Sequence, residues 1–163
     1  MGLIRFQPSR RSAGAPEVKE FDIQSSASFP DGAPLQRDTV QKDIEEHAGG
    51  ATVTGIIGVS MFGVSSGVPA AKGGTAFGTK MLVAIANRDT EFVGTMINGS
   101  TIQTPNSDND GTEYGIVKVS GEWYVDEGDS GTTGNGHVVL TTTGFDANRK
   151  IVFFKFIDSA VSS

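Results

Sequence analysis

Glycine and turn-forming pairs interrupt this chain too often for long helices. The 163 residues include 22 glycines, and pairs such as Asp31-Gly32 and Gly49-Gly50 recur at short intervals. A glycine inside a helix costs about 1 kcal/mol relative to alanine, because it loses more backbone freedom on folding. The segments between the turns are short and rich in β-branched residues, which is typical of strands. The pattern predicts an all-β fold, either a small β-barrel or a β-sandwich.

Two hairpins are the clearest local predictions. The segments 113–119 (EYGIVKV) and 122–125 (EWYV) flank Ser120-Gly121. Asn98-Gly99 separates two further strand candidates, and it predicts a type I′ turn, in which both central residues have positive φ. Further strands are expected at 52–60, 81–86, 137–142 and 150–157, loops at 65–75 and 126–136, and either two helical turns or a strand at 38–48.

The apolar positions of these strands predict the core. In the last strand we expect Ile151 and Phe153 to face inward, with Phe154 as a further candidate, while Lys150 and Lys155 stay in solvent. The Phe153-Phe154 pair breaks strict alternation and suggests burial on both faces of that strand. The predicted core consists of Ile56, Ile57, Leu82, Val83, Ile85, Phe92, Ile116, Trp123, Val139, Ile151, Phe153 and Phe156.

Charge and composition exclude several classes of protein. The net charge is −6, which argues against a general nucleic-acid binder. The absence of cysteine excludes disulfides, cysteine nucleophiles and thiolate metal sites. No apolar run is long enough for a signal peptide or a membrane-spanning helix. We therefore expect a soluble protein with no nucleic-acid partner and no membrane partner.

The first twelve residues have the opposite charge to the rest of the chain. Three arginines and no acid give them +3, so the remaining residues carry −9. Through about residue 28 the chain is polar and shows no sustained period of 2 or 3.6. This predicts an extended N-terminal arm over 1–28 and a single β-domain over 29–163. Apolar residues between the arginines favour an arm that orders against a partner over a frayed terminus or an expression leader.

Short motifs that resemble catalytic or ion-binding sites lack the rest of the machinery. Gly128-Asp129-Ser130-Gly131 is similar to the nucleophile segment of chymotrypsin-like serine proteases. Such a serine needs a histidine base and an orienting carboxylate, and neither His47 nor His137 stands in that family's sequence setting. A Gly/Ser/Asp tetrapeptide is also a common turn composition. We interpret this segment as a turn.

The segment 106–111 (NSDNDG) resembles the first half of a calcium loop. The bidentate glutamate expected at position twelve is missing, because Val117 stands there. Lys72-Gly73-Gly74-Thr75 lacks the glycine spacing of a phosphate-binding loop. We expect a solvated turn at 106–111, which leaves weak cation binding open, and we predict no catalytic residues, no metal and no cofactor.

Four segments together resemble the capsid decoration, or cement, proteins of tailed bacteriophages. The first two are 29–35 (FPDGAPL) and 54–60 (TGIIGVS), in which a phenylalanine and a glycine open a strand pair and an Ile-Gly strand follows. The others are 80–94 (KMLVAIANRDTEFVG) and 150–158 (KIVFFKFID). The resemblance implies a β-rich structural protein of the virion, without catalytic residues. Such a protein binds the outer surface of an icosahedral head and stabilises it by bridging neighbouring major capsid proteins.

The resemblance also implies partners. We expect the major capsid protein as partner, together with a homo-oligomer, a trimer or a dimer. The alternatives are another virion component (a head fibre base, a tail protein or a receptor-binding module) and, further away, a small-ligand-binding β-barrel or a hydrolase. The residues expected to contact the capsid are those of the basic arm: Leu3, Ile4, Arg5, Phe6, Arg10 and Arg11.

Overall fold

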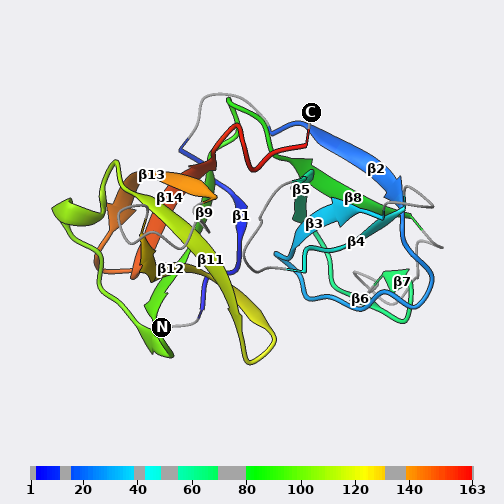
Figure 1. Ribbon diagram of the computed structural model, residues 1–163, viewed down its shortest axis with the longest axis horizontal. Coiled ribbons are helices and arrows are strands. Elements are labelled where there is room, and N and C mark those ends of the chain that lie inside the picture. Colours follow the sequence, from blue (N-terminus) through cyan, green and yellow to red (C-terminus); the bar gives the residue numbers. More distant parts are fainter. Residues whose placement is uncertain are drawn as a thin grey trace.

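Two β-sheets make up most of the fold, and they lie side by side in Figure 1. The computed structural model describes residues 3–11, 16–38, 43–48, 55–69, 80–130 and 139–162. Apart from one 3₁₀ turn, η1 (Ser107–Asn109), the regular structure of these residues is β, which confirms the all-β class. The strands are β1 (Gln7–Pro8), β2 (Val18–Asp22), β3 (Pro34–Arg37), β4 (Ile44–Glu46), β5 (Gly58–Ser60), β6 (Val64–Ser65), β7 (Val68–Pro69), β8 (Lys80–Ile85), β9 (Phe92–Asn98), β10 (Thr101–Ile102), β11 (Glu113–Val119), β12 (Glu122–Ser130), β13 (Leu140–Asp146) and β14 (Ile151–Phe156).

The larger sheet contains a closed circuit of strand pairings. Strand β9 pairs with β12 in parallel, and β12, β11, β13 and β14 follow as antiparallel neighbours. Strand β14 then pairs with β9 again, through the register Phe153↔Val93 and Phe154↔Phe92. Strands β1 and β10 are further partners of β9. The smaller sheet has the order β2-β8-β5-β3-β4, and a parallel bridge between Ile23 and Ile44 links the end of β2 to the start of β4. Strands β6 and β7 form a separate pair.

Both predicted hairpins are present, but their turns differ. Ser120 and Gly121 join β11 to β12 and have φ values of 51° and 83°, so both central residues are left-handed, as in a type I′ turn. Asn98 pairs with Thr101, so the second turn consists of Gly99 and Ser100. Only Gly99 has positive φ there, at 63°, as in a type II′ turn. The type I′ prediction for Asn98-Gly99 was therefore wrong, because Asn98 is the last strand residue.

The closing strand is buried on both faces at Ile151 and Val152, as its Phe-Phe pair suggested, but Phe153 was wrongly predicted to lie in the core. Val152, Phe154 and Phe156 belong to the core, whereas Phe153 is half-buried on the other face. The Phe154 ring lies 6.0 Å from that of Phe92 and 5.4 Å from that of Phe156. Side chains along a strand alternate between its two faces, so the neighbours Phe153 and Phe154 point in opposite directions and only one of them can enter the core.

Most of the other predicted core positions are confirmed. Ile56, Ile57, Val83, Phe92, Trp123, Val139, Ile151 and Phe156 are buried, and Ile85 and Ile116 pack against the core partly buried. Leu82 was predicted wrongly and is 38% exposed. Its neighbours Met81 and Val83 on β8 are buried in the core, so Leu82 points to the opposite face.

Residues 126–130 form strand rather than the predicted polar loop. Strand β12 continues to Ser130, so Gly128-Asp129-Ser130 is not a turn. Gly115 of β11 pairs with Asp126, but Tyr114 pairs with Ser130, so residues 127–129 have no counterpart on β11. The turn-like composition therefore forms a bulge within a strand. The segment 38–48, left open between helix and strand, contributes β4 within its described part.

Two connections tie the sheets to each other away from the N-terminal segment. Glu46 of β4 accepts hydrogen bonds from Lys118 Nζ (2.7 Å) and Trp123 Nε1 (2.8 Å) of the β11–β12 hairpin. Beyond β14 the chain crosses to the smaller sheet (red in Figure 1), where Ile56 exchanges backbone hydrogen bonds with Ala160 and Ser162. The fold is therefore closed by contacts between residues far apart in sequence.

Candidate interaction surface

The basic residues expected to bind a partner lie in the segment 3–11, which runs along β9. Thr95 holds the backbone of Ile4: its hydroxyl accepts from the Ile4 N–H and donates to the Ile4 carbonyl, both at 3.0 Å, and its own N–H donates to the same carbonyl. Next along the chain, β1 pairs with β9 through Gln7↔Val93 and Pro8↔Phe92. The segment is thus an added strand of the larger sheet.

Phe6 is a core residue. Its side chain is 1% exposed, and its ring lies 5.2 Å from that of Phe154 in an edge-on arrangement. Two glycines make room for it. A Cβ on Gly94 would lie 2.4 Å from Phe6 Cδ1, and a Cβ on Gly32 would lie 2.8 Å from the Phe6 carbonyl oxygen. Because Gly94 belongs to the larger sheet and Gly32 precedes β3 of the smaller one, Phe6 lies at the junction of the two.

Arg5 is paired with a carboxylate of the same chain. Its Nε and Nη2 donate to the two oxygens of Glu122 at 2.9 and 2.7 Å, an exposed bidentate ion pair. The hydrogen bonds and the charge of Glu122 raise the pKa of Arg5. The pair fixes the segment to the first residue of β12.

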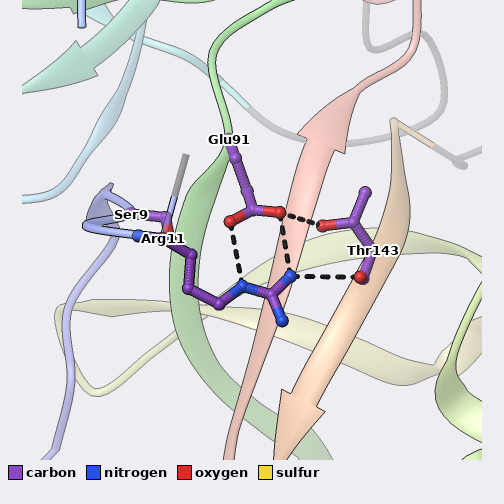
Figure 2. Close-up of polar contacts among 4 residues, drawn as sticks. All are labelled: Ser9, Arg11, Glu91 and Thr143. Atoms are coloured by element: carbon purple, nitrogen blue, oxygen red, sulfur yellow. Dashed lines mark hydrogen bonds and ion pairs between the residues drawn. The ribbon is translucent and has the colours of Figure 1, made fainter. Parts of the chain in front are cut away.

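Arg11 forms the most elaborate polar contact of the segment (Figure 2). Its Nε and Nη2 donate to Glu91 at 3.2 and 2.9 Å, and Nη2 also donates to the Thr143 carbonyl at 3.1 Å. The Thr143 hydroxyl donates to the same carboxylate at 2.6 Å. The guanidinium lies 3.8 Å from the centroid of the Phe153 ring. Arg11 therefore connects Glu91, directly before β9, with Thr143 of β13. Its guanidinium also covers the ring of Phe153 on β14, which lies outside the core.

The environment of Glu91 favours its ionised form. Burial by itself would raise the pKa of this carboxyl, but hydrogen bonds from Arg11, Thr143 and Ser9, together with the charge of Arg11, lower it below its ordinary value. The Glu91 side chain is 9% exposed and that of Arg11 44%. The carboxylate is thus enclosed, while its arginine partner keeps one side toward solvent.

The expectation of an extended arm does not fit the described part of 1–28. Residues 3–11 contribute β1 and Phe6, and residues 16–28 contribute β2, which pairs with β8 through Val18↔Ala84 to Asp22↔Lys80. The apolar residues between the arginines led us to expect contact with a partner, whereas the observed contacts are with other segments of the same chain. The glycines that admit Phe6 lie far away in sequence, so the segment's own composition does not show them.

The six residues predicted to contact a partner divide into four groups. Phe6 is buried in the core, and Arg5 and Arg11 are paired with acids of the same chain. Leu3 and Ile4 are half-buried. Arg10 is exposed, and it lines a hollow of about 440 Å³ together with Arg11, Arg149, Val93 and Phe153. Arg149 was not predicted from the sequence, because its only signal was its position beside the closing strand.

The other motifs have structural roles where the chain is described. In 106–111 the Asn106 side chain caps η1, and the buried Asn109 donates to the Tyr114 hydroxyl (2.8 Å) and to Glu127 (3.2 Å). His47 is buried beside β4. His137 and Lys72-Gly73-Gly74-Thr75 lie outside the described residues.

The described ranges contain neither a cluster of metal-binding side chains nor a membrane-spanning helix. No group of three or more histidine or acidic side chains is placed there to hold a metal ion. None of the helical structure in that part of the chain is long and apolar enough to cross a membrane. Comparison with known proteins found neither a family model nor a curated protein that matches this chain.

Proposed function

We propose that this protein is a capsid decoration, or cement, protein that binds the outside of an icosahedral phage head and bridges neighbouring major capsid proteins. The observation that carries the proposal is that the segments resembling that family meet in space. Strand β3 pairs with β5 through Pro34↔Val59 and Leu35↔Gly58, and β5 pairs with β8 through Gly58↔Ile85. Three of the four segments thus converge on Gly58.

The contacts around Gly58 explain why the segments 29–35 and 54–60 need particular residues. A Cβ on Gly58 would lie 2.1 Å from the Ala84 carbonyl oxygen, so the strand after the two isoleucines needs a glycine there. The Ser60 hydroxyl donates to the Pro30 carbonyl (2.9 Å) and accepts from the Ala33 N–H (2.8 Å). Phe29, the first residue of the motif, is buried. The resemblance therefore rests on residues that form one packed unit.

The role in cementing a shell agrees with the way the sheets are tied together. A bridging protein transmits force between the subunits that it joins, so its own parts must not separate under load. Here the segment 3–11, the Glu46 contacts and the crossing chain at Ile56 each connect the sheets. Several weak attachments to the shell, multiplied in a symmetric oligomer, then give strong binding by avidity.

Cryo-electron microscopy of particles made with and without this chain tests the proposal. We expect extra density on the outer surface of the head that disappears when the gene is deleted. Particles that lack the protein should release their DNA at a lower temperature than complete particles do. Density on the tail or at a fibre base would favour the other virion roles. Absence of the chain from purified particles would contradict a virion role altogether.

A further inference from the structure

Four of the six arginines have partners within the chain. Arg5, Arg11 and Arg88 form bidentate pairs with Glu122, Glu91 and Asp158, and Arg37 lies over the Phe21 ring at 5.1 Å. Arg10 and Arg149 differ: within the described ranges neither guanidinium is paired with a carboxylate. The two exceptions line the same hollow.

The hollow lies on the outer face of three neighbouring strands. Gln7 of β1 and Phe153 of β14 both pair with Val93 of β9, so these residues form one row across the sheet. The hollow that they line has a volume of about 440 Å³. Its floor is apolar where Val93 and Phe153 lie, and its rim carries the arginines.

Charge around the hollow is locally reversed relative to the whole chain. Arg10 follows β1 and Arg149 lies in the turn before β14, so the two belong to different segments. The net charge of the chain is −6. Asp146 accepts only the backbone N–H of Arg149, at 3.1 Å. Lys155 follows Phe153 by two residues on β14, so it belongs to the same face and adds positive charge. Two guanidiniums without a carboxylate partner among the described residues therefore line the hollow, where an anion would bind.

We propose that this hollow binds an acidic peptide segment of a protein partner. Arg10 and Arg149 would each donate to a carboxylate of that segment, since guanidinium and carboxylate match in bidentate geometry. Val93 and the exposed part of Phe153 would contact the apolar atoms between the acids. Arg11 is already held by Glu91 and Thr143 and stacked on Phe153, so it supports the floor in a fixed position.

A protein segment fits this site better than a nucleic acid does. A nucleic acid carries a negative charge at each nucleotide, and beyond the hollow it would meet a chain whose net charge is −6. A peptide brings one or two carboxylates and places uncharged atoms elsewhere. The partner's chemistry follows from the hollow alone, whereas its identification as a capsid subunit rests on the proposed function.

Fluorescence anisotropy with labelled probes tests the chemistry. The probe is a Ser-Glu-Leu-Glu-Ser peptide, and its controls are the same peptide with glutamine for glutamate and a short oligothymidylate. We compare the full chain with the R10Q/R149Q double variant and with R88Q. The last is the matched control, because Arg88 is a surface arginine 82% exposed and paired elsewhere. We expect the acidic peptide to bind the native chain and the R88Q chain equally, and to lose about tenfold in affinity or more for R10Q/R149Q.

Other outcomes overturn the inference. R88Q removes one positive charge and R10Q/R149Q removes two, so a loss of binding free energy in R88Q half as large as that in R10Q/R149Q would show attraction by net charge alone. Tighter binding of the oligothymidylate would indicate a phosphate site. No binding of the acidic peptide at low salt, where such contacts are strongest, would also contradict it. Attachment of R10Q/R149Q to particles separates the two proposals. If the R10Q/R149Q chain decorates heads as well as the native chain does, the cement role stands and the hollow does not contribute to it.

Discussion

Two parts of the N-terminal stretch, the segment 3–11 and strand β2, look alike in sequence but are used differently. Both are polar, both carry basic and apolar residues, and each pairs with one strand of a sheet. Phe6 of the first is 1% exposed in the core. Phe21 of the second is only half-buried, and Val18 is 39% exposed.

The difference lies in the surfaces that receive them. Gly94 leaves space for a phenylalanine ring on β9, and Gly32 lets the backbone of the same segment approach from the other side. Strand β2 meets side chains of β8 in an ordinary antiparallel ladder. A segment without a clear period can therefore be part of the core when distant glycines admit it.

The largest expected effect comes from truncating the two phenylalanines. Phe6→Ala should reduce the free energy of unfolding by about 3–5 kcal/mol, because it empties a closed site in the core. Phe21→Ala should cost less than half of that, since its ring is partly solvated in the native state. Urea denaturation of both variants measures the difference. Equal effects would mean that the segment 3–11 is no more integrated than β2.

The next effect tests the space above Gly94. Gly94→Ala places a methyl group 2.4 Å from the Phe6 ring and should cost about 1–3 kcal/mol. Gly128→Ala is the control, because a Cβ there meets only side-chain oxygens of Asp126 and Asn98, at 3.2 Å and beyond. Adding Phe6→Leu to Gly94→Ala should recover part of the loss, and strict additivity of the two changes would contradict their contact.

A smaller effect separates two arginine pairs with similar geometry. Arg11→Gln leaves the enclosed Glu91 carboxylate without its charged donor and should cost about 1–2 kcal/mol. Arg88→Gln breaks an exposed pair with Asp158 and should change stability by less than about 0.5 kcal/mol. Thermal unfolding of the two variants measures both effects. A loss for Arg88→Gln as large as that for Arg11→Gln would show that enclosure does not matter here.

The smallest effect concerns acid. The pKa of Glu91 is lower in the folded chain than its ordinary value, so its ionised form favours folding. This contribution is complete above the unfolded pKa of about 4.3 and disappears as pH falls through the folded pKa. Thr143→Ala removes one hydrogen bond to the carboxylate, so the pKa should rise and the acid loss should begin at higher pH. NMR titration of the Glu91 carboxyl carbon measures this, and an unchanged titration would exclude Thr143 as a cause.

Local signals predicted the parts of the fold that are determined locally. Ser120-Gly121 specified its hairpin because both residues tolerate positive φ. The alternation of β14 was ambiguous, since Phe153 and Phe154 are equally apolar and only Phe6, Phe92 and Phe156 decide which one faces inward. The bulge at 127–129 has the composition of a turn, so its pairing with β11 could not be predicted from the segment itself.

The candidate site was predicted in part. The reversed charge of the first twelve residues directed attention to that segment, and Arg10, which lines the hollow, was among the residues named. Which arginine is paired internally depends on Glu91 and Glu122, which are distant in sequence. Arg149 joins Arg10 only through the pairing of β1 and β14 with β9, a long-range register that no local pattern encodes.

The contact between Phe6 and Phe154 also fixes the order of events during synthesis. Phe6 is synthesised long before Phe154, whose ring receives it. At about 5–20 residues per second, the nascent segment waits on the order of ten seconds before its site exists. The core around Phe6 can therefore close only after β14 has been synthesised, so the segment 3–11 depends for its final place on residues at the other end of the sequence.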